Sequence, residues 1–146
     1  MALSNRDRVG RALEIMARGL GPFVDQHMAA ALPSGRDWLQ VMTERARSSG
    51  RPATMVRSDP RLLLQVISEH SRAFRDSLSR TEMAFAQEIR EAGNKWAHHD
   101  SQAFSDADTS RVLDTIVRLL RAAGAVAEAG EVDKLLFDHQ RAAFER

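Results

Sequence analysis

The sequence predicts an all-α protein, a helical bundle with a central antiparallel pair of longer helices. Apolar residues recur three and four positions apart through most of the 146 residues, which is the period of an amphipathic helix. Tyrosine is absent, and no long run alternates apolar with polar residues as a half-buried strand would. Glycine, proline and capping residues separate the periodic segments. The length suits a single domain, which we expect to span residues 1–146.

Four helices and one long loop are predicted in the first half of the chain. The predicted helices span 6–20, 23–32, 34–42 and 58–79. The pair Gly21–Pro22 separates the first two, because proline interrupts a helix interior and is favoured in a first turn. Residues 47–58, RSSGRPATMVRS, hold the turn-forming residues of a loop. Pro60 marks the start of the next helix, which either Ser58 or Asp59 can cap.

Three more helices are predicted in the second half. They span 82–96, 109–123 and about 127 to the end. Residues 97–106 form a polar link, and Gly124 is a natural stop after the second of these helices. On the last helix, Phe144 belongs to the apolar stripe, whereas His139 is expected at the surface or at its boundary.

The composition argues against several classes of protein. The chain has no cysteine, which excludes a disulfide framework, a thiolate metal site and a cysteine nucleophile. Its apolar runs are too short to cross a bilayer, and MALSNRDRVG lacks the apolar core of a signal peptide. We therefore expect a cytoplasmic protein with no membrane partner. The net charge is only +1, so any nucleic-acid site must be a local basic surface.

The stretch REAGNKWAHHD, residues 90–100, is not explained by amphipathic helix alone. If the helix continues, Arg90, Asn94 and His98 lie on one face, because residues four apart share a side of a helix. An imidazole can take the proton of a ribose 2′-hydroxyl, and a guanidinium can hold the phosphate while negative charge develops. An amide can orient either group. This scheme for phosphodiester cleavage needs no metal ion and no other cofactor, and we predict neither.

With this stretch at its centre, the sequence resembles the HEPN superfamily (higher eukaryotes and prokaryotes nucleotide-binding domains), particularly its Swt-type branch. The resemblance runs from SNRDRVGRALEIMARGLGPFV through DPRLLLQVI and EIREAGNKWAHHD to RVLDTIVRLLRAAGA and EVDKLLFDHQRAAFER. It implies an HEPN-like helical bundle. Active members of the family are metal-independent endoribonucleases, in which an arginine, a polar residue and then a histidine form the motif. Carried over to this chain, the polar residue is Asn94 and the histidine is His98.

The arginine of that motif is missing from its expected position. The residue immediately before Asn94 is Gly93. Arg90 lies about one turn earlier and could reach the site with its long side chain, and Lys95 could supply charge from a neighbouring direction. Glycine within a helix costs about 1 kcal/mol relative to alanine. Drift would explain Gly93, and so would the close approach of a partner helix.

Three functions follow from the resemblance and from this departure. The first is an endoribonuclease in which His98 is the general base, Asn94 orients and Arg90 replaces the missing arginine. The second is a catalytically silent HEPN domain that binds RNA. The third is a non-catalytic helical module for dimerisation or partner docking within a larger defence or RNA-quality-control protein. The resemblance also implies a homodimer that forms through the motif-bearing helices.

A second set of residues is expected to contact RNA phosphates. Its members are Lys95, Arg51, Arg57 and Arg61. The three arginines belong to the basic stretch that flanks the predicted loop, and the planar fork of arginine suits phosphate binding. Trp96, by contrast, is most simply a core anchor at the end of its helix, and adjacent histidines on a helix diverge too far to predict a metal site at residues 98–100.

Overall fold

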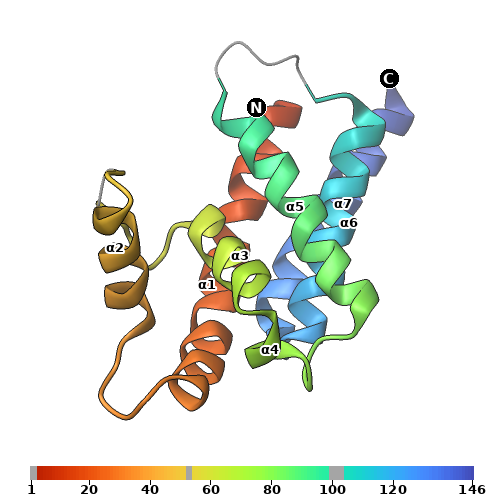
Figure 1. Ribbon diagram of the computed structural model, residues 1–146. Helices are drawn as coiled ribbons and strands as arrows, with labels where there is room; N and C mark the ends of the chain where they lie inside the picture. The colour runs from red at the N-terminus through yellow and green to blue at the C-terminus, as the bar shows by residue number, and fades with distance from the viewer. Residues whose placement is uncertain (1–2, 52–53, 99–103) are drawn as a thin grey trace.

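The computed structural model describes residues 3–51, 54–98 and 104–146, which form seven helices and no strand (Figure 1). The helices are α1 (Asn5–Ala31), α2 (Trp38–Ser48), α3 (Pro60–Glu69), α4 (Ser71–Phe74), α5 (Arg80–Ala97), α6 (Asp106–Ala122) and α7 (Val126–Glu145). The predicted all-α class is confirmed. In this described part of the chain, no helix is both long and apolar enough to cross a membrane.

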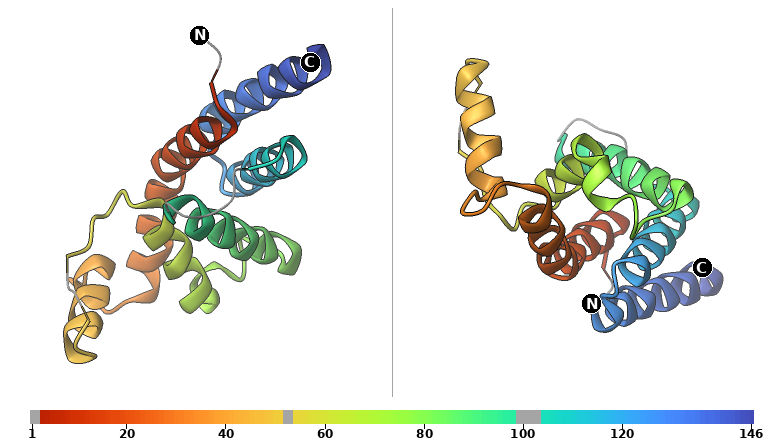
Figure 2. Two further views of the ribbon diagram at one scale, coloured as in Figure 1. Left: turned by 90° about the horizontal axis from the view of Figure 1, so that it is seen from above. Right: turned by 60° about the horizontal axis from the view of Figure 1, so that its bottom comes forward.

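Four of the helices run in alternating directions along the body of the molecule. In the view of Figure 1, α1 descends from the N-terminus, α5 ascends, α6 descends and α7 ascends to the C-terminus. α5 and α6 are antiparallel and pack against each other, and α6 also packs against α1 and α7. The longest helices in the described residues are α1, with 27 residues, and α7, with 20. α3 packs against α1 and α5, whereas α2 lies to one side of the bundle (Figure 2).

The core is formed where α1, α3, α5 and α6 meet. Its largest fully buried side chains are Phe74, Met16, Leu20, Met28, Leu63, Leu64, Ile67, Ile89, Leu113, Ile116, Leu119 and Leu120. Full burial of one such side chain contributes about 1.5–3 kcal/mol relative to exposure. Tertiary burial of this kind, rather than helix propensity, therefore holds the elements in place.

α1 is one helix of 27 residues, so the predicted break at Gly21–Pro22 is wrong. Pro22 lies inside the helix, with an exposed side chain. A proline in a helix interior costs about 3 kcal/mol, because it removes a hydrogen bond and crowds the preceding turn. Leu20, Phe23 and Val24 are buried around it. Burial on both sides of the proline offsets that cost and keeps the two segments in one helix.

Other helix boundaries also differ from the prediction. The predicted helix 58–79 divides at His70, whose φ of −113° and ψ of 43° lie outside the helical region. α2 begins at Trp38 rather than near 34, because Gly35 has a φ of +83°, which a right-handed helix does not contain. α6 begins three residues early because Ser105 accepts a hydrogen bond from the backbone of Asp108.

Several predicted helix ends are confirmed. Asp59 caps α3 and Pro60 occupies its first turn. α5, by contrast, begins two residues before the predicted start at 82, because Ser79 and Glu82 form a capping box in which each side chain accepts from the other residue's backbone. Gly124 follows α6 with a φ of +78°, a conformation that favours glycine.

Two residues of α7 are placed differently from the prediction. His139 is fully buried, and its Nε2 lies 3.0 Å from the carbonyl oxygen of Asp106 at the start of α6. Phe144 is 91% exposed. It lies five residues beyond His139 and so points about 140° away around the helix axis. The buried face of α7 therefore passes through His139, not through Phe144.

Candidate functional site

The C-terminal end of α5 is anchored on α1 by Trp96. The indole Nε1–H donates to the carbonyl oxygen of Arg6 at 3.1 Å, and the Arg6 guanidinium lies 5.1 Å from the centre of the ring. Gly10 leaves the space for the indole, because a Cβ at that position would lie 2.9 Å from one of its ring atoms. The prediction that Trp96 anchors the helix end in the core is confirmed.

Arg61 of α3 occupies the space beside Gly93. A Cβ added to Gly93 would lie 3.3 Å from Cγ of Arg61, and no other atom is as close as 4 Å apart from the helix's own backbone and chain neighbours. From there the Arg61 Nε–H donates to the side-chain oxygen of Asn94 at 3.1 Å. The stem of one arginine therefore covers the glycine, and its guanidinium is held by the polar residue of the motif.

A groove between α3 and α5 is formed around this contact. Its volume is about 230 Å³, and its lining residues are Thr54, Met55, Asp59, Arg61, Leu62, Gln65, Arg90 and Asn94. The carboxylate of Asp59 already accepts the backbone N–H of Arg61 at 2.9 Å as the helix cap. In the described part of the chain Arg90 makes no ion pair. Two guanidiniums against one carboxylate give the groove a net positive charge, which suits a phosphate.

His98 stands at the end of α5 rather than within it. The helix ends at Ala97, and the His98 backbone is extended, with φ −88° and ψ 117°. The histidine is exposed, and its backbone N–H donates to the carbonyl oxygen of Lys95 at 3.3 Å. Arg90 and Asn94 share a face as predicted, whereas His98 follows one turn later and is not among the residues that line the groove. His99 and Asp100 lie outside the described residues.

Lys95 and Arg57 make contacts with acidic groups of the chain itself. Nζ of Lys95 lies 3.8 Å from a carboxylate oxygen of Asp108 and 4.7 Å from the centre of the Phe104 ring. Arg57 donates to Asp25 at 2.9 Å and to both oxygens of Asp37 at 2.6 Å. This hydrogen bonding holds the pKa of the Asp37 carboxyl below its ordinary value. Arg57 thus ties the loop before α3 to α1 and α2.

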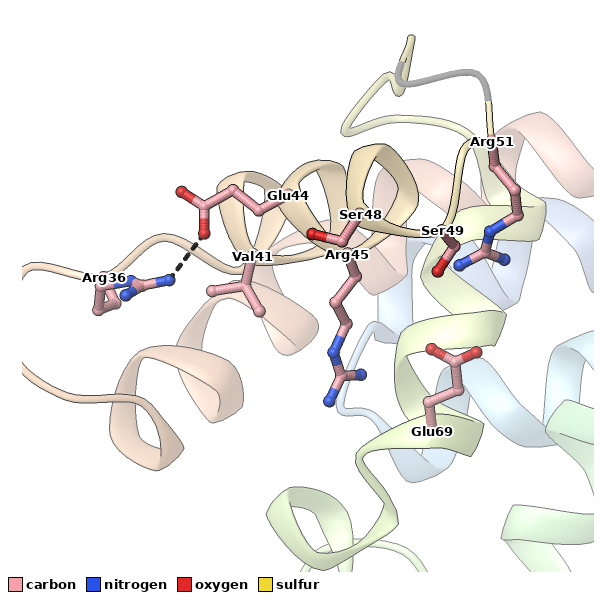
Figure 3. Close-up of a pocket in the computed structure, with 8 residues that line it drawn as sticks. All are labelled: Arg36, Val41, Glu44, Arg45, Ser48, Ser49, Arg51 and Glu69. Atoms are coloured by element: carbon pink, nitrogen blue, oxygen red, sulfur yellow. Dashed lines mark hydrogen bonds and ion pairs between the residues drawn. The ribbon is translucent and has the colours of Figure 1, made fainter.

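Arg51 lies at a separate hollow between α2 and the end of α3, shown in Figure 3. The hollow has a volume of about 730 Å³ and is lined by Arg36, Val41, Glu44, Arg45, Ser48, Ser49, Arg51 and Glu69. Arg36 is paired there with Glu44 at 3.1 Å. The four residues predicted to bind RNA therefore lie at different places, and Arg61 is the one that shares the groove with Arg90 and Asn94.

No group of three or more histidine or acidic side chains in the described ranges could hold a metal ion. The groove itself offers the guanidiniums of Arg61 and Arg90 and the side-chain amide of Asn94. Guanidiniums can bind and neutralise a phosphate, and an amide can orient one of them.

The model of the Swt1-like HEPN family matches residues 11–124, and the chain belongs to this family. The match includes α1 from its second turn, α2 through α6, and the whole groove, and it ends before α7. The helical bundle is the fold of HEPN domains, and the membership supports an RNA-associated function in general. Neither a curated protein nor a solved structure matches the chain.

The contact between Arg61 and Asn94 is the part of the site that the sequence analysis missed. Arg61 was expected to contact RNA, but not to lie against Gly93. The two partners of the contact are 33 positions apart, on different helices, so no helical period links them. The available signal was Gly93 itself. Glycine is unfavourable in a helix, and one explanation of Gly93 was the close approach of a neighbouring helix.

Proposed function

We propose that this protein is a metal-independent endoribonuclease that holds the RNA backbone at the groove between α3 and α5. Membership of the HEPN family supports an RNA substrate. The observation that carries the proposal is the meeting of Arg61, Arg90 and Asn94 in one groove, with His98 one turn beyond Asn94. Two guanidiniums provide the phosphate site, the Asn94 amide positions one of them, and His98 provides the base.

The reaction is an internal transesterification. The imidazole of His98 takes the proton of a ribose 2′-hydroxyl, and the 2′-oxygen attacks the adjacent phosphorus. The bond from phosphorus to the 5′-oxygen breaks, and the departing oxygen takes a proton from water. The products are a 2′,3′-cyclic phosphate and a 5′-hydroxyl. A positioned general base contributes about 10²–10⁴-fold to such a step. The guanidiniums stabilise the charge on the phosphate oxygens as it develops.

We also propose that the active form is a homodimer that assembles through the motif-bearing helices. The groove residues of α5, Arg90 and Asn94, are half-buried in the single chain and line its groove, and in the dimer the second copy brings its own His98 to this groove. Sedimentation at several concentrations tests this: the proposal expects a dimer, and a chain that stays monomeric while it cleaves RNA contradicts it. Further domains of a larger protein would direct the activity to particular RNAs.

Cleavage of a labelled structured RNA in EDTA tests the proposed function. The wild-type chain should cut the RNA and leave a cyclic phosphate, and His98→Ala should lose about 10²-fold or more of the rate. His99→Ala is the matched control, because it removes the adjacent histidine that the motif does not use, and it should keep most of the rate. Failure of the wild-type chain to cut a broad panel of RNAs would overturn the proposal.

A docking module without catalysis is the second candidate, and one observation favours it. Phe137 and Phe144 of α7 are 64% and 91% exposed, and seven residues apart they lie on the same side of the helix. Exposed aromatic side chains of this kind are common at protein interfaces. If the EDTA assay shows no cleavage, paired Phe137→Ser and Phe144→Ser substitutions with a binding readout test this candidate.

A further inference from the structure

We propose that Arg61, supplied by α3, takes the place of the arginine that the HEPN motif expects at position 93. This inference rests on the proposed function, because it names the residue that holds the reacting phosphate. It also differs from the simplest expectation, in which Arg90 of the same helix replaces the missing side chain. The guanidinium reaches the site from a neighbouring helix instead.

The absence of a side chain at position 93 is what admits Arg61. The distance of 3.3 Å from Arg61 Cγ to the position of a Cβ at residue 93 is shorter than an ordinary carbon contact, so Arg61 would have to shift by a few tenths of an ångström for alanine and by more for a longer side chain. Gly93 is buried, whereas Ala92 and Asn94 on either side of it are only half-buried. Gly93 and Arg61 therefore belong to one arrangement. Glycine is less favourable than alanine in α5, and its missing side chain leaves room for Arg61 of α3.

The hydrogen bond to Asn94 sets the direction of the guanidinium. Arginine carries five N–H donors in a rigid planar fork. Nε–H is used on the Asn94 oxygen at 3.1 Å, and within the described residues the two terminal nitrogens make no hydrogen bond and no ion pair. Four donors therefore remain on the side of the fork that binds phosphate in a bidentate manner. Asn94 acts as a positioning residue, because it holds the arginine rather than the RNA.

Arg90 meets fewer of these requirements. It lines the same groove, but in the described part of the chain no hydrogen bond joins it to Asn94. Its guanidinium is therefore not fixed relative to the motif, and the ordering of a long side chain on binding costs free energy. Arg90 is better placed to contact a neighbouring phosphate and to add affinity. Replacement of Arg90 should weaken binding and slow cleavage by similar factors, because the contact is made before the reaction as well as during it.

The test compares charge-removing variants in two assays. Arg61→Gln and Arg90→Gln are made beside Arg72→Gln, the matched control, which removes an exposed arginine of α4 with no ion pair in the described residues. Binding is measured with a 2′-O-methyl RNA, which lacks the free 2′-hydroxyl and cannot be cut. Cleavage is measured in EDTA with the corresponding RNA. Thermal unfolding checks that each variant folds.

Arg61→Gln is expected to reduce affinity for the 2′-O-methyl RNA several-fold and to lower the salt slope by about 1, since one phosphate contact is lost. Cleavage is expected to fall by about 10²–10³-fold, as when one donor to the transition state is removed. Arg72→Gln should match the wild-type chain in both assays. The double variant Arg61→Ala/Gly93→Arg, which returns the arginine to the motif, should recover most of the cleavage lost in Arg61→Ala.

Equal cleavage by Arg61→Gln and Arg72→Gln would overturn the inference while leaving the nuclease proposal intact. If the wild-type chain binds RNA but does not cut it, the nuclease proposal fails. The inference is then decided by binding alone: loss of affinity in Arg61→Gln supports Arg61 as the phosphate ligand, and affinity equal to the control overturns it. A wild-type chain that neither binds nor cuts RNA overturns both.

Discussion

Gly10 is the residue of α1 against which the end of α5 is packed, and Gly10→Ala should destabilise the protein. The added Cβ would lie 2.9, 3.0 and 3.1 Å from three atoms of the Trp96 indole. The indole is rigid and also donates to the Arg6 carbonyl oxygen, so it cannot move away without loss of that hydrogen bond. Overpacking costs about 1–3 kcal/mol. Loss of the hydrogen bond adds about 1 kcal/mol.

Helix propensity acts in the opposite direction. Alanine favours a helix over glycine by about 1 kcal/mol, which leaves a net loss of about 1–3 kcal/mol in the free energy of unfolding. For a domain of this size the midpoint of thermal unfolding should fall by roughly 3–10 °C. The matched control is Gly130→Ala in α7, where an added Cβ meets no atom within 4 Å. That variant should gain up to about 1 kcal/mol.

Urea and thermal unfolding of both variants, followed by circular dichroism, measure the difference directly. Near-ultraviolet spectra of Gly10→Ala should also change, because the environment of Trp96 is altered. A Gly10→Ala variant at least as stable as Gly130→Ala would refute the reasoning. It would mean that Trp96 does not pack on α1 as closely as the distances require.

Three further outcomes are expected. Gly93→Ala should leave stability equal or slightly raised, because helix propensity gains about 1 kcal/mol, yet it should slow RNA cleavage, because the new Cβ lies 3.3 Å from Arg61 Cγ and shifts the arginine away from α5; equal cleavage in parallel assays would contradict this. Pro22→Ala should raise the free energy of unfolding by about 1 kcal/mol or more, since α1 regains a backbone donor; a lower value in urea titration would contradict it. Arg57→Gln should destabilise the chain at pH 7 and much less at pH 3: the pKa of Asp37 is lowered by Arg57, so the pair's contribution exists above the ordinary pKa and is lost as the pH falls through the folded one. A difference between wild type and Arg57→Gln that does not depend on pH would refute that assignment.

Local signals in the sequence predicted most of the helices. Capping residues mark the start of α3 at Asp59, and Gly124 marks the end of α6. The break predicted at Gly21–Pro22 failed for a tertiary reason, because burial of residues on both sides of the proline is not visible to a local pattern. The division at His70 was missed because the apolar period continues through it. Phe74, beyond the break, is buried as one continuous helix would also predict.

The sequence predicted the part of the candidate site that lies on the single helix α5, and it did not predict the contact that α3 makes with it. The four-residue spacing correctly placed Arg90 and Asn94 on one face of α5. It did not place His98, because the helix ends at Ala97 and the helical period stops there. The partner of Asn94 comes from another helix, and the single sequence contains no periodic signal for that contact. The contact follows from the packing of α3 on α5, which is set by the buried core beneath them.

The measurement that tests the central claim most directly compares an RNA with its 2′-O-methyl analogue of the same sequence, both in EDTA. The account predicts that the wild-type chain binds both with similar affinity. It predicts that only the RNA is cut, with a 2′,3′-cyclic phosphate on one product and a 5′-hydroxyl on the other. Cleavage of the 2′-O-methyl analogue, or cleavage of the RNA only after a divalent metal ion is added, would contradict it.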